Sequence, residues 1–157
     1  MTLPVRPETD ASIERLKSAF PRSGSALLPA LHLIQEEKGF ISEESMAYVA
    51  EKLELAPAFV AGVVSFYTMF HTKPVGRHHI QLCRTLPCAL RGCGEILEHL
   101  RRRLGIKEGE TTPDGRFSLV TVECLGTCDT APIVQINDQE HGHLDAAKVD
   151  ALLDSLE

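Results

Sequence analysis

The stretch His78-His79-Ile80-Gln81-Leu82-Cys83-Arg84-Thr85-Leu86-Pro87-Cys88 joins an alternating apolar run to a pair of cysteines. A second pair follows after 35 intervening residues (89–123), in Cys124-Leu125-Gly126-Thr127-Cys128. Four thiolates that converge on one inorganic centre are typical of iron–sulfur clusters and of structural zinc. The cysteines therefore predict a metal centre, and we favour a [2Fe–2S] cluster.

The residues between the two cysteine pairs explain how the pairs can meet. We expect a strand over 78–82, a helix over 90–104 and a second strand over 117–122. Two strands joined by a helix are usually parallel, with a right-handed crossover. Cys83 directly follows the first strand and Cys124 comes two residues after the second. Both pairs should therefore leave the sheet at the same edge, where open α/β sheets usually bind ligands.

The rest of this region completes a small α/β domain over residues 76–157. A third strand is expected over 132–136, a short fourth near 141–144, and a last helix capped by Asp145. The predicted order is β-α-β-β-β-α. The run Lys73-Pro74-Val75-Gly76 is typical of a linker and predicts the domain boundary.

The first 75 residues predict a bundle of short helices. Capping residues mark helix starts at Asp10, Ser42 and Pro57 and a helix end at Gly39. By the same periodicity, the aromatic stretch 65–70 is expected in the core rather than on a docking surface. The apolar positions at helical spacing are Ile13, Leu16, Phe20, Leu27, Leu31, Ile34, Met46, Val49, Ala50, Leu53, Val60, Val63 and Val64.

The loops around the cysteines suit a negatively charged centre. Residues 84–87 can wrap it with backbone N–H groups directed at sulfur, and Gly126 can adopt the positive φ that a tight turn requires. Arg84 and Arg91 are placed to compensate the charge of the cluster, although an ordinary surface role suits each arginine as well.

Two other interpretations of the thiols stay open. A zinc-stabilised interaction module would use the same four cysteines, but zinc ribbons favour C-x2-C pairs, and neither pair here has that spacing. A thiol-redox enzyme would need a C-x-x-C dithiol, which is absent. The fifth cysteine, Cys93, is expected to be a small buried apolar residue, with an exchange for Cys88 left open. The seven histidines are unnecessary to this chemistry.

Composition limits the partners and the location. The net charge of −6 argues against nucleic acid, and no apolar run approaches the 18 or so residues of a membrane helix. We expect the basic run 101–103 to be a solvated helix end. Residues 1–7 lack the apolar core of a signal peptide, so we expect a short flexible leader and a cytoplasmic protein.

The motifs resemble those of the thioredoxin-like [2Fe–2S] ferredoxin family, which has members in the bacterial NADH–quinone oxidoreductase (respiratory complex I). The resemblance implies an N-terminal helical bundle followed by a thioredoxin-like domain that holds one [2Fe–2S] cluster. It implies Cys83, Cys88, Cys124 and Cys128 as the cluster ligands. The resembling stretches are 65–70, 73–76, 83–92, 123–132 and Asn137-Asp138.

The same resemblance implies an electron-transfer subunit of an NADH dehydrogenase. Its cluster would exchange single electrons with the FMN of a partner flavoprotein that oxidises NADH, beside further iron–sulfur subunits. The chain has no GxGxxG fingerprint, so FMN and NADH are expected on the partner. The complex would place the chain at the inner membrane without direct insertion. Similar subunits occur in NAD-reducing hydrogenases and NAD-dependent formate dehydrogenases, and the residues do not distinguish these assemblies.

Overall fold

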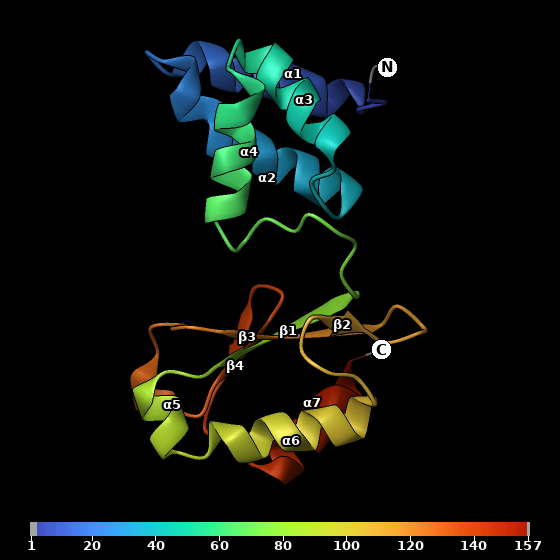
Figure 1. Cartoon of the computed structure of the whole chain (residues 1–157), viewed down its shortest axis with the longest axis vertical. Helices are drawn as coiled ribbons and strands as arrows, with labels where there is room; N and C mark the ends of the chain where they lie inside the picture. The colour runs from blue at the N-terminus through green and yellow to red at the C-terminus, as the bar shows by residue number, and fades with distance from the viewer. Residues whose placement is uncertain (1–2, 157) are drawn as a thin grey trace. The chain divides into compact units, whose positions relative to one another are not determined.

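A computed structural model describes residues 3–156 of the chain. The chain forms two compact units, one extending to Pro74 and the other starting at Val75 (Figure 1). The first unit is helical, and the second combines a sheet with helices. Among the described residues, no helix has both the length and the apolar character needed to cross a bilayer.

Helices alone build the first unit, as predicted. Buried apolar side chains from all four α-helices form one core that includes Ile13, Leu31, Leu53 and Val60. The helices are α1 (Pro7–Ala19), α2 (Leu27–Lys38), α3 (Glu43–Leu53) and α4 (Pro57–Phe66), with a short 3-10 turn at Ser23–Ala26 before α2.

Three of the predicted helix ends are confirmed. Gly39 ends α2 in the left-handed conformation, with φ at 82°. The Ser42 hydroxyl accepts a hydrogen bond from the Ser45 N–H at 3.1 Å and so caps α3. Pro57 occupies the first position of α4, where its missing N–H costs nothing.

The predicted cap at Asp10 is wrong. Helix α1 begins at Pro7, three residues before Asp10, because proline suits a first helical position, and Asp10 lies inside the helix. The Asp10 carboxylate accepts a hydrogen bond from the Tyr48 hydroxyl and pairs with Lys52 Nζ at 2.6 Å. Asp10 therefore joins α1 to α3 instead of capping α1.

The described part of the predicted leader, residues 3–6, precedes α1 and contacts α2. Met1 and Thr2 lie outside the described residues. The backbone N–H of Arg6 donates to both carboxylate oxygens of Glu37, at 3.1 and 3.2 Å. The segment directly before α1 is thus tied to the end of α2.

The aromatic stretch 65–70 is mostly exposed, contrary to the prediction. Only Phe70 enters the core; Phe66 is 76% exposed, and Tyr67 and Met69 are also exposed. The helical period does not extend through this stretch, because α4 ends at Phe66. Val60 and Val64 supply the buried side of α4 instead.

A five-stranded sheet of order β2-β3-β1-β4-β5 forms the second unit. Strands β1 and β3 are parallel, as predicted, and every other pairing is antiparallel. Strand β2 was not predicted, since two residues carry no periodicity, and β5 begins two residues before the predicted 141–144 and overlaps it only at His141. The strands are β1 (His78–Cys83), β2 (Glu110–Thr111), β3 (Phe117–Val122), β4 (Val134–Ile136) and β5 (Gln139–His141).

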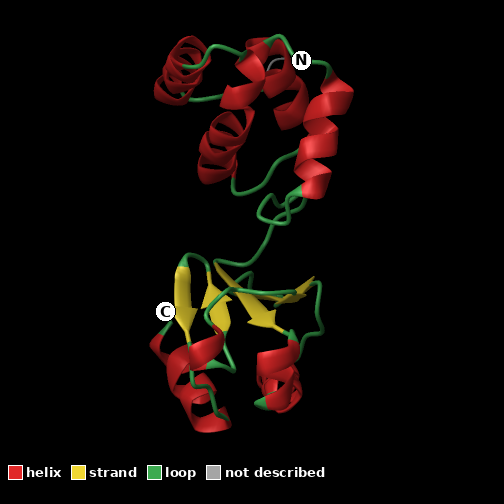
Figure 2. Cartoon of the chain, turned by 90° about the vertical axis from the view of Figure 1, so that its left-hand side faces the viewer, coloured by secondary structure: helices red, strands yellow, loops and turns green. Residues whose placement is uncertain are grey.

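The predicted helix 90–104 is present as α6 (Cys93–Leu104), and a short helix that was not predicted, α5 (Leu86–Leu90), precedes it. The chain breaks between them at Gly92, whose φ of 88° is incompatible with a continuous helix. Helix α6 and the last helix, α7 (Ala146–Ser155), lie on the same face of the sheet (Figure 2). The predicted cap of α7 is confirmed, since the Asp145 carboxylate accepts from the Lys148 N–H at 2.8 Å.

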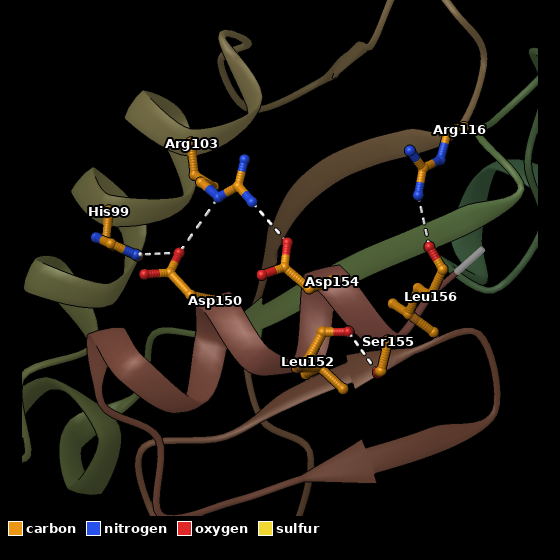
Figure 3. Close-up of polar contacts among 8 residues, drawn as sticks. All are labelled: His99, Arg103, Arg116, Asp150, Leu152, Asp154, Ser155 and Leu156. Carbon is orange, nitrogen blue, oxygen red and sulfur yellow. Dashed lines mark hydrogen bonds and ion pairs between the residues drawn. The ribbon is translucent and has the colours of Figure 1, made fainter.

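Polar contacts join α6 to α7 along their exposed edges (Figure 3). His99 Nε2 lies 2.9 Å from Asp150 Oδ1, and Arg103 Nη2 donates to Asp154 Oδ1 at 2.6 Å. Arg101 pairs with Glu98 and Glu108. Two members of the basic run 101–103 are therefore held in ion pairs at the end of the helix.

Candidate metal centre

The parallel pairing of β1 and β3 brings the two cysteine loops to one edge of the sheet. Cys83 is the last residue of β1 and stands opposite Val122, the last residue of β3. Cys124 follows Val122 by two residues. Figure 1 shows α5 and the segment after β3 at this same end of the unit. The topology therefore brings together residues about forty positions apart in sequence, as the sequence predicted.

The first thiol pair is buried. Cys83 and Cys88 are 2% and 1% exposed, and their side chains are in hydrogen-bonding contact. Helix α5 makes this possible, because it turns the chain back so that Cys88 faces the end of β1. The Cys83 thiol also contacts Thr85 Oγ1 at 3.3 Å and donates to the Glu123 carbonyl at 3.2 Å.

The second pair lies in an exposed loop. The Cys124 and Cys128 side chains are in hydrogen-bonding contact. A negative charge on Cys83 contributes to raising the pKa of Cys128. Gly126, between them, has a φ of 87°, which is the positive value expected for the tight turn. The four thiols thus approach one another as two pairs.

Hydrogen bonds to the Cys83 sulfur atom lower the pKa of this thiol. Burial raises the pKa of this thiol, but the Thr85 side chain and the backbone N–H groups of Thr85 and Leu125 outweigh that effect and lower it. Two effects raise the pKa of Cys88: burial, which is the larger, and contact with Cys83. Loss of hydration and the neighbouring Cys124 raise the pKa of Cys128. A bound metal cation would offset these increases in pKa, because it holds the thiols in their deprotonated form.

The two thiol pairs suit a dinuclear centre. A [2Fe–2S] cluster has two irons and takes four cysteines, so that each pair can serve one iron. The donor set therefore fits the cluster.

The hairpin after β4 braces the second cysteine loop, a feature that sequence reasoning missed. The Thr127 hydroxyl donates to Glu140 Oε2 at 3.1 Å, and the His143 N–H donates to the Thr130 carbonyl at 2.5 Å. A Cβ added at Gly142 would lie 2.5 Å from Thr130 Cβ. Only glycine allows this approach. In the sequence, the one sign of such a contact was a glycine between two histidines.

Three further residues near the centre were considered from the sequence. Cys93 is the first residue of α6 and is buried in the core of this unit, as predicted for a small apolar side chain. Arg84, expected to compensate the cluster, is bound to the Glu123 carboxylate. Arg91 is exposed.

A family model described as thioredoxin-like [2Fe-2S] ferredoxin matches residues 13–157. The chain belongs to this family. The match covers both units, and the resemblance predicted from the cysteine motifs is confirmed.

Relatives of known name agree with this membership of the thioredoxin-like [2Fe–2S] ferredoxin family. A subunit of the NADH-quinone oxidoreductase of Rhizobium meliloti is 48% identical, over 91% of this chain and 85% of the relative. NADH-quinone oxidoreductase subunit 2 of Thermus thermophilus is 40% identical, over 92% of this chain and 81% of the relative. The mitochondrial NADH dehydrogenase [ubiquinone] flavoprotein 2 of Dictyostelium discoideum is 43% identical, over 95% of this chain and 62% of the relative.

A solved structure is also similar. The NAD+-reducing [NiFe]-hydrogenase in its air-oxidised state matches with a TM-score of 0.72 and 29% identity, over 83% of this chain. The matched region makes up 22% of the hydrogenase chain, so this protein spans about a fifth of that polypeptide.

Proposed function

We propose that this chain is the electron-transfer subunit of an NADH dehydrogenase and that it holds one [2Fe–2S] cluster. The proposed ligands are Cys83, Cys88, Cys124 and Cys128. The observation that carries this proposal is the meeting of two thiol pairs at the end of the parallel strands β1 and β3.

Each pair of cysteines would bind one of the two irons. Cys83 and Cys88 would hold one iron inside the fold, where burial excludes water, and Cys124 and Cys128 would hold the other near the surface. The bound cluster supplies a one-electron change of charge. The backbone N–H groups of Thr85 and Leu125 would stabilise the added negative charge on sulfur without moving.

The substrate chemistry belongs to a partner. The chain has no nucleotide-binding fingerprint, so we place NADH and FMN on a flavoprotein subunit, with further iron–sulfur subunits in the same complex. The names of the relatives support an NADH–quinone oxidoreductase. Through that complex the chain would lie at the periphery of the inner membrane.

A second assembly remains a candidate because of the hydrogenase match. The corresponding subunit of an NAD-reducing hydrogenase would use the same four cysteines. The identity of 48% to the quinone-linked relative, against 29% to the hydrogenase, favours the first assembly. Isolating the native complex and testing NADH-dependent reduction of quinone against hydrogen-dependent reduction of NAD+ would separate the two.

The first test is spectroscopic. Anaerobically purified protein should be brown, contain about two irons and no zinc per chain, and give a rhombic S = 1/2 EPR signal after reduction with dithionite. A colourless protein with one zinc would replace this proposal with the zinc-stabilised module. Cys124→Ser should lose or badly destabilise the cluster, and a normal spectrum in that variant would refute the ligand assignment.

A further inference from the structure

A cavity of about 230 Å³ lies where α6, the start of β3 and α7 come together. We call it the Arg116 cavity. It is at the opposite end of β3 from the thiols, because Phe117 begins this strand and Cys124 follows its last residue, Val122, by two positions. The strand spans about 17 Å between Phe117 and Val122. The residues that line the cavity are Arg103, Leu104, Arg116, Phe117, Leu153 and Asp154.

The protein binds the Arg116 guanidinium only in part. Its Nη2 donates to the Leu156 carbonyl at 2.5 Å (Figure 3), and its Cζ lies 5.0 Å from the centre of the Phe117 ring. Among residues 3–156, the guanidinium makes no ion pair, and its Nε is buried without a hydrogen-bond partner. A charged group has thus lost water without full replacement by protein acceptors, which costs free energy.

The other charges around the cavity already have partners. Arg103 pairs with Asp154 at 2.6 Å and with Asp150 at 3.4 Å (Figure 3). Asp114 accepts from the Arg116 backbone N–H at 3.0 Å and interacts with the guanidinium only at longer range. The charged side chains that line the cavity are two arginines and one aspartate, so one positive charge is left without a partner.

The rest of the lining is apolar. Leu104, Phe117 and Leu153 form it, and they pack within or against the core of this unit. Pockets for drug-sized ligands have volumes of roughly 300–1,000 Å³, so this cavity suits a smaller molecule. One unpaired cation beside apolar walls is complementary to one negative charge on a short apolar body. A phosphate dianion fits less well, because its second charge would face Asp154.

We propose that the Arg116 cavity binds a small monocarboxylate. The carboxylate would accept hydrogen bonds from the Arg116 guanidinium, whose planar set of donors matches the two oxygens. The short hydrocarbon part would pack against Leu104 and Leu153. The contacts of Arg116 with Phe117 and Leu156 hold the guanidinium in place before the ligand binds. This site lies at the far end of β3 from the cysteines, and the proposal does not rest on the cluster.

The test is an NMR titration of the whole ¹⁵N-labelled chain, in its cluster-loaded form, with butyrate at constant ionic strength. The Nε–Hε signal of Arg116 reports on the site. Butyramide, a neutral molecule of the same shape, is the control ligand. We expect saturable shifts at Arg116 and Phe117 with a Kd on the order of millimolar for butyrate, and binding of butyramide at least about tenfold weaker.

A pair of variants tests the role of the charge. Arg116→Gln should weaken butyrate binding about tenfold or more, because it removes the unpaired cation. Arg102→Gln makes the same change at an exposed residue of α6 outside the lining, and its Kd should stay within about twofold of the native value. If Arg116→Gln does not fold, the comparison of butyrate with butyramide on the native chain decides alone.

Three results would overturn the proposal. The first is the absence of a saturable shift at butyrate concentrations well above the millimolar range. The second is an equal response to butyrate and butyramide, or an equal Kd in the two variants, since the charge of Arg116 would then not select the ligand. The third is phosphate binding as tight as butyrate binding, which would refute a monocarboxylate as the ligand.

Discussion

Arg84 Nε donates a hydrogen bond to Glu123 Oε1 at 3.1 Å, and this contact joins the two cysteine loops. Arg84 follows Cys83 directly, and Glu123 precedes Cys124. Both side chains are mostly exposed, so the pair contributes little to stability. Its importance is electrostatic, since a cation and an anion lie together beside the proposed cluster.

Removing one charge of this pair should shift the reduction potential. Glu123→Gln should raise it and Arg84→Gln should lower it, because reduction adds negative charge to the cluster. A unit charge at about 8 Å in water is worth roughly 0.5 kcal/mol, which is about 20 mV for one electron. Redox titration followed by EPR measures this. Shifts of the same sign in the two variants would contradict the electrostatic explanation.

Replacing Cys93 should leave the cluster in place. Cys93→Ser puts a hydroxyl into a buried site and should cost about 1–3 kcal/mol of stability, with iron content and EPR signal unchanged. Cys88→Ser is the matched comparison and should lose iron. Denaturant unfolding and iron analysis of both variants check this. Iron loss in Cys93→Ser would identify Cys93 as a ligand.

The close approach of Gly142 to Thr130 predicts a local effect on the second cysteine loop. In Gly142→Ala the new methyl would lie 2.5 Å from Thr130 Cβ, which should cost about 1–3 kcal/mol and speed iron release to a chelator. Gly94→Ala, in α6, is the control, since nothing lies within 4 Å of its added Cβ. That change should stabilise the protein by up to about 1 kcal/mol. Equal iron-release rates in the two variants would rule out bracing by Gly142.

Glu37 should make the helical unit sensitive to acid. Its side chain pairs with Lys38 Nζ at 2.8 Å and accepts from Thr9 and Arg6, which together lower its pKa to about 2. A carboxylate with a depressed pKa stabilises the folded state above its unfolded value of about 4.5, and this contribution is lost as the pH falls towards 2.

Hydrogen–deuterium exchange of α1, compared between the native chain and Glu37→Gln, measures this effect locally. Protection should be greater in the native chain above pH 4.5, and the difference should vanish as the pH approaches 2. A difference that stayed constant over this range would show that the charge of Glu37 does not hold α1.

The sequence predicted most of the fold because its signals are local. Gly39, Ser42, Pro57 and Asp145 mark helix ends through backbone chemistry that needs no distant partner. The predictions that were wrong concern features that local signals do not determine. Pro7 starts α1 ahead of Asp10, whose carboxylate serves a contact with α3, and the exposure of Phe66 depends on where α4 ends.

For the candidate site too, some features follow from the sequence and others only from the folded structure. The amino-acid order alone specifies the four thiols, their spacing and their positions after two strands joined by a helix, since parallel pairing follows from that connection. The folded chain was needed to show that the thiols meet as one buried and one exposed pair, that Arg84 binds Glu123, and that Gly142 supports Thr130. These contacts depend on where distant loops come to lie, and no periodicity along the chain encodes that placement.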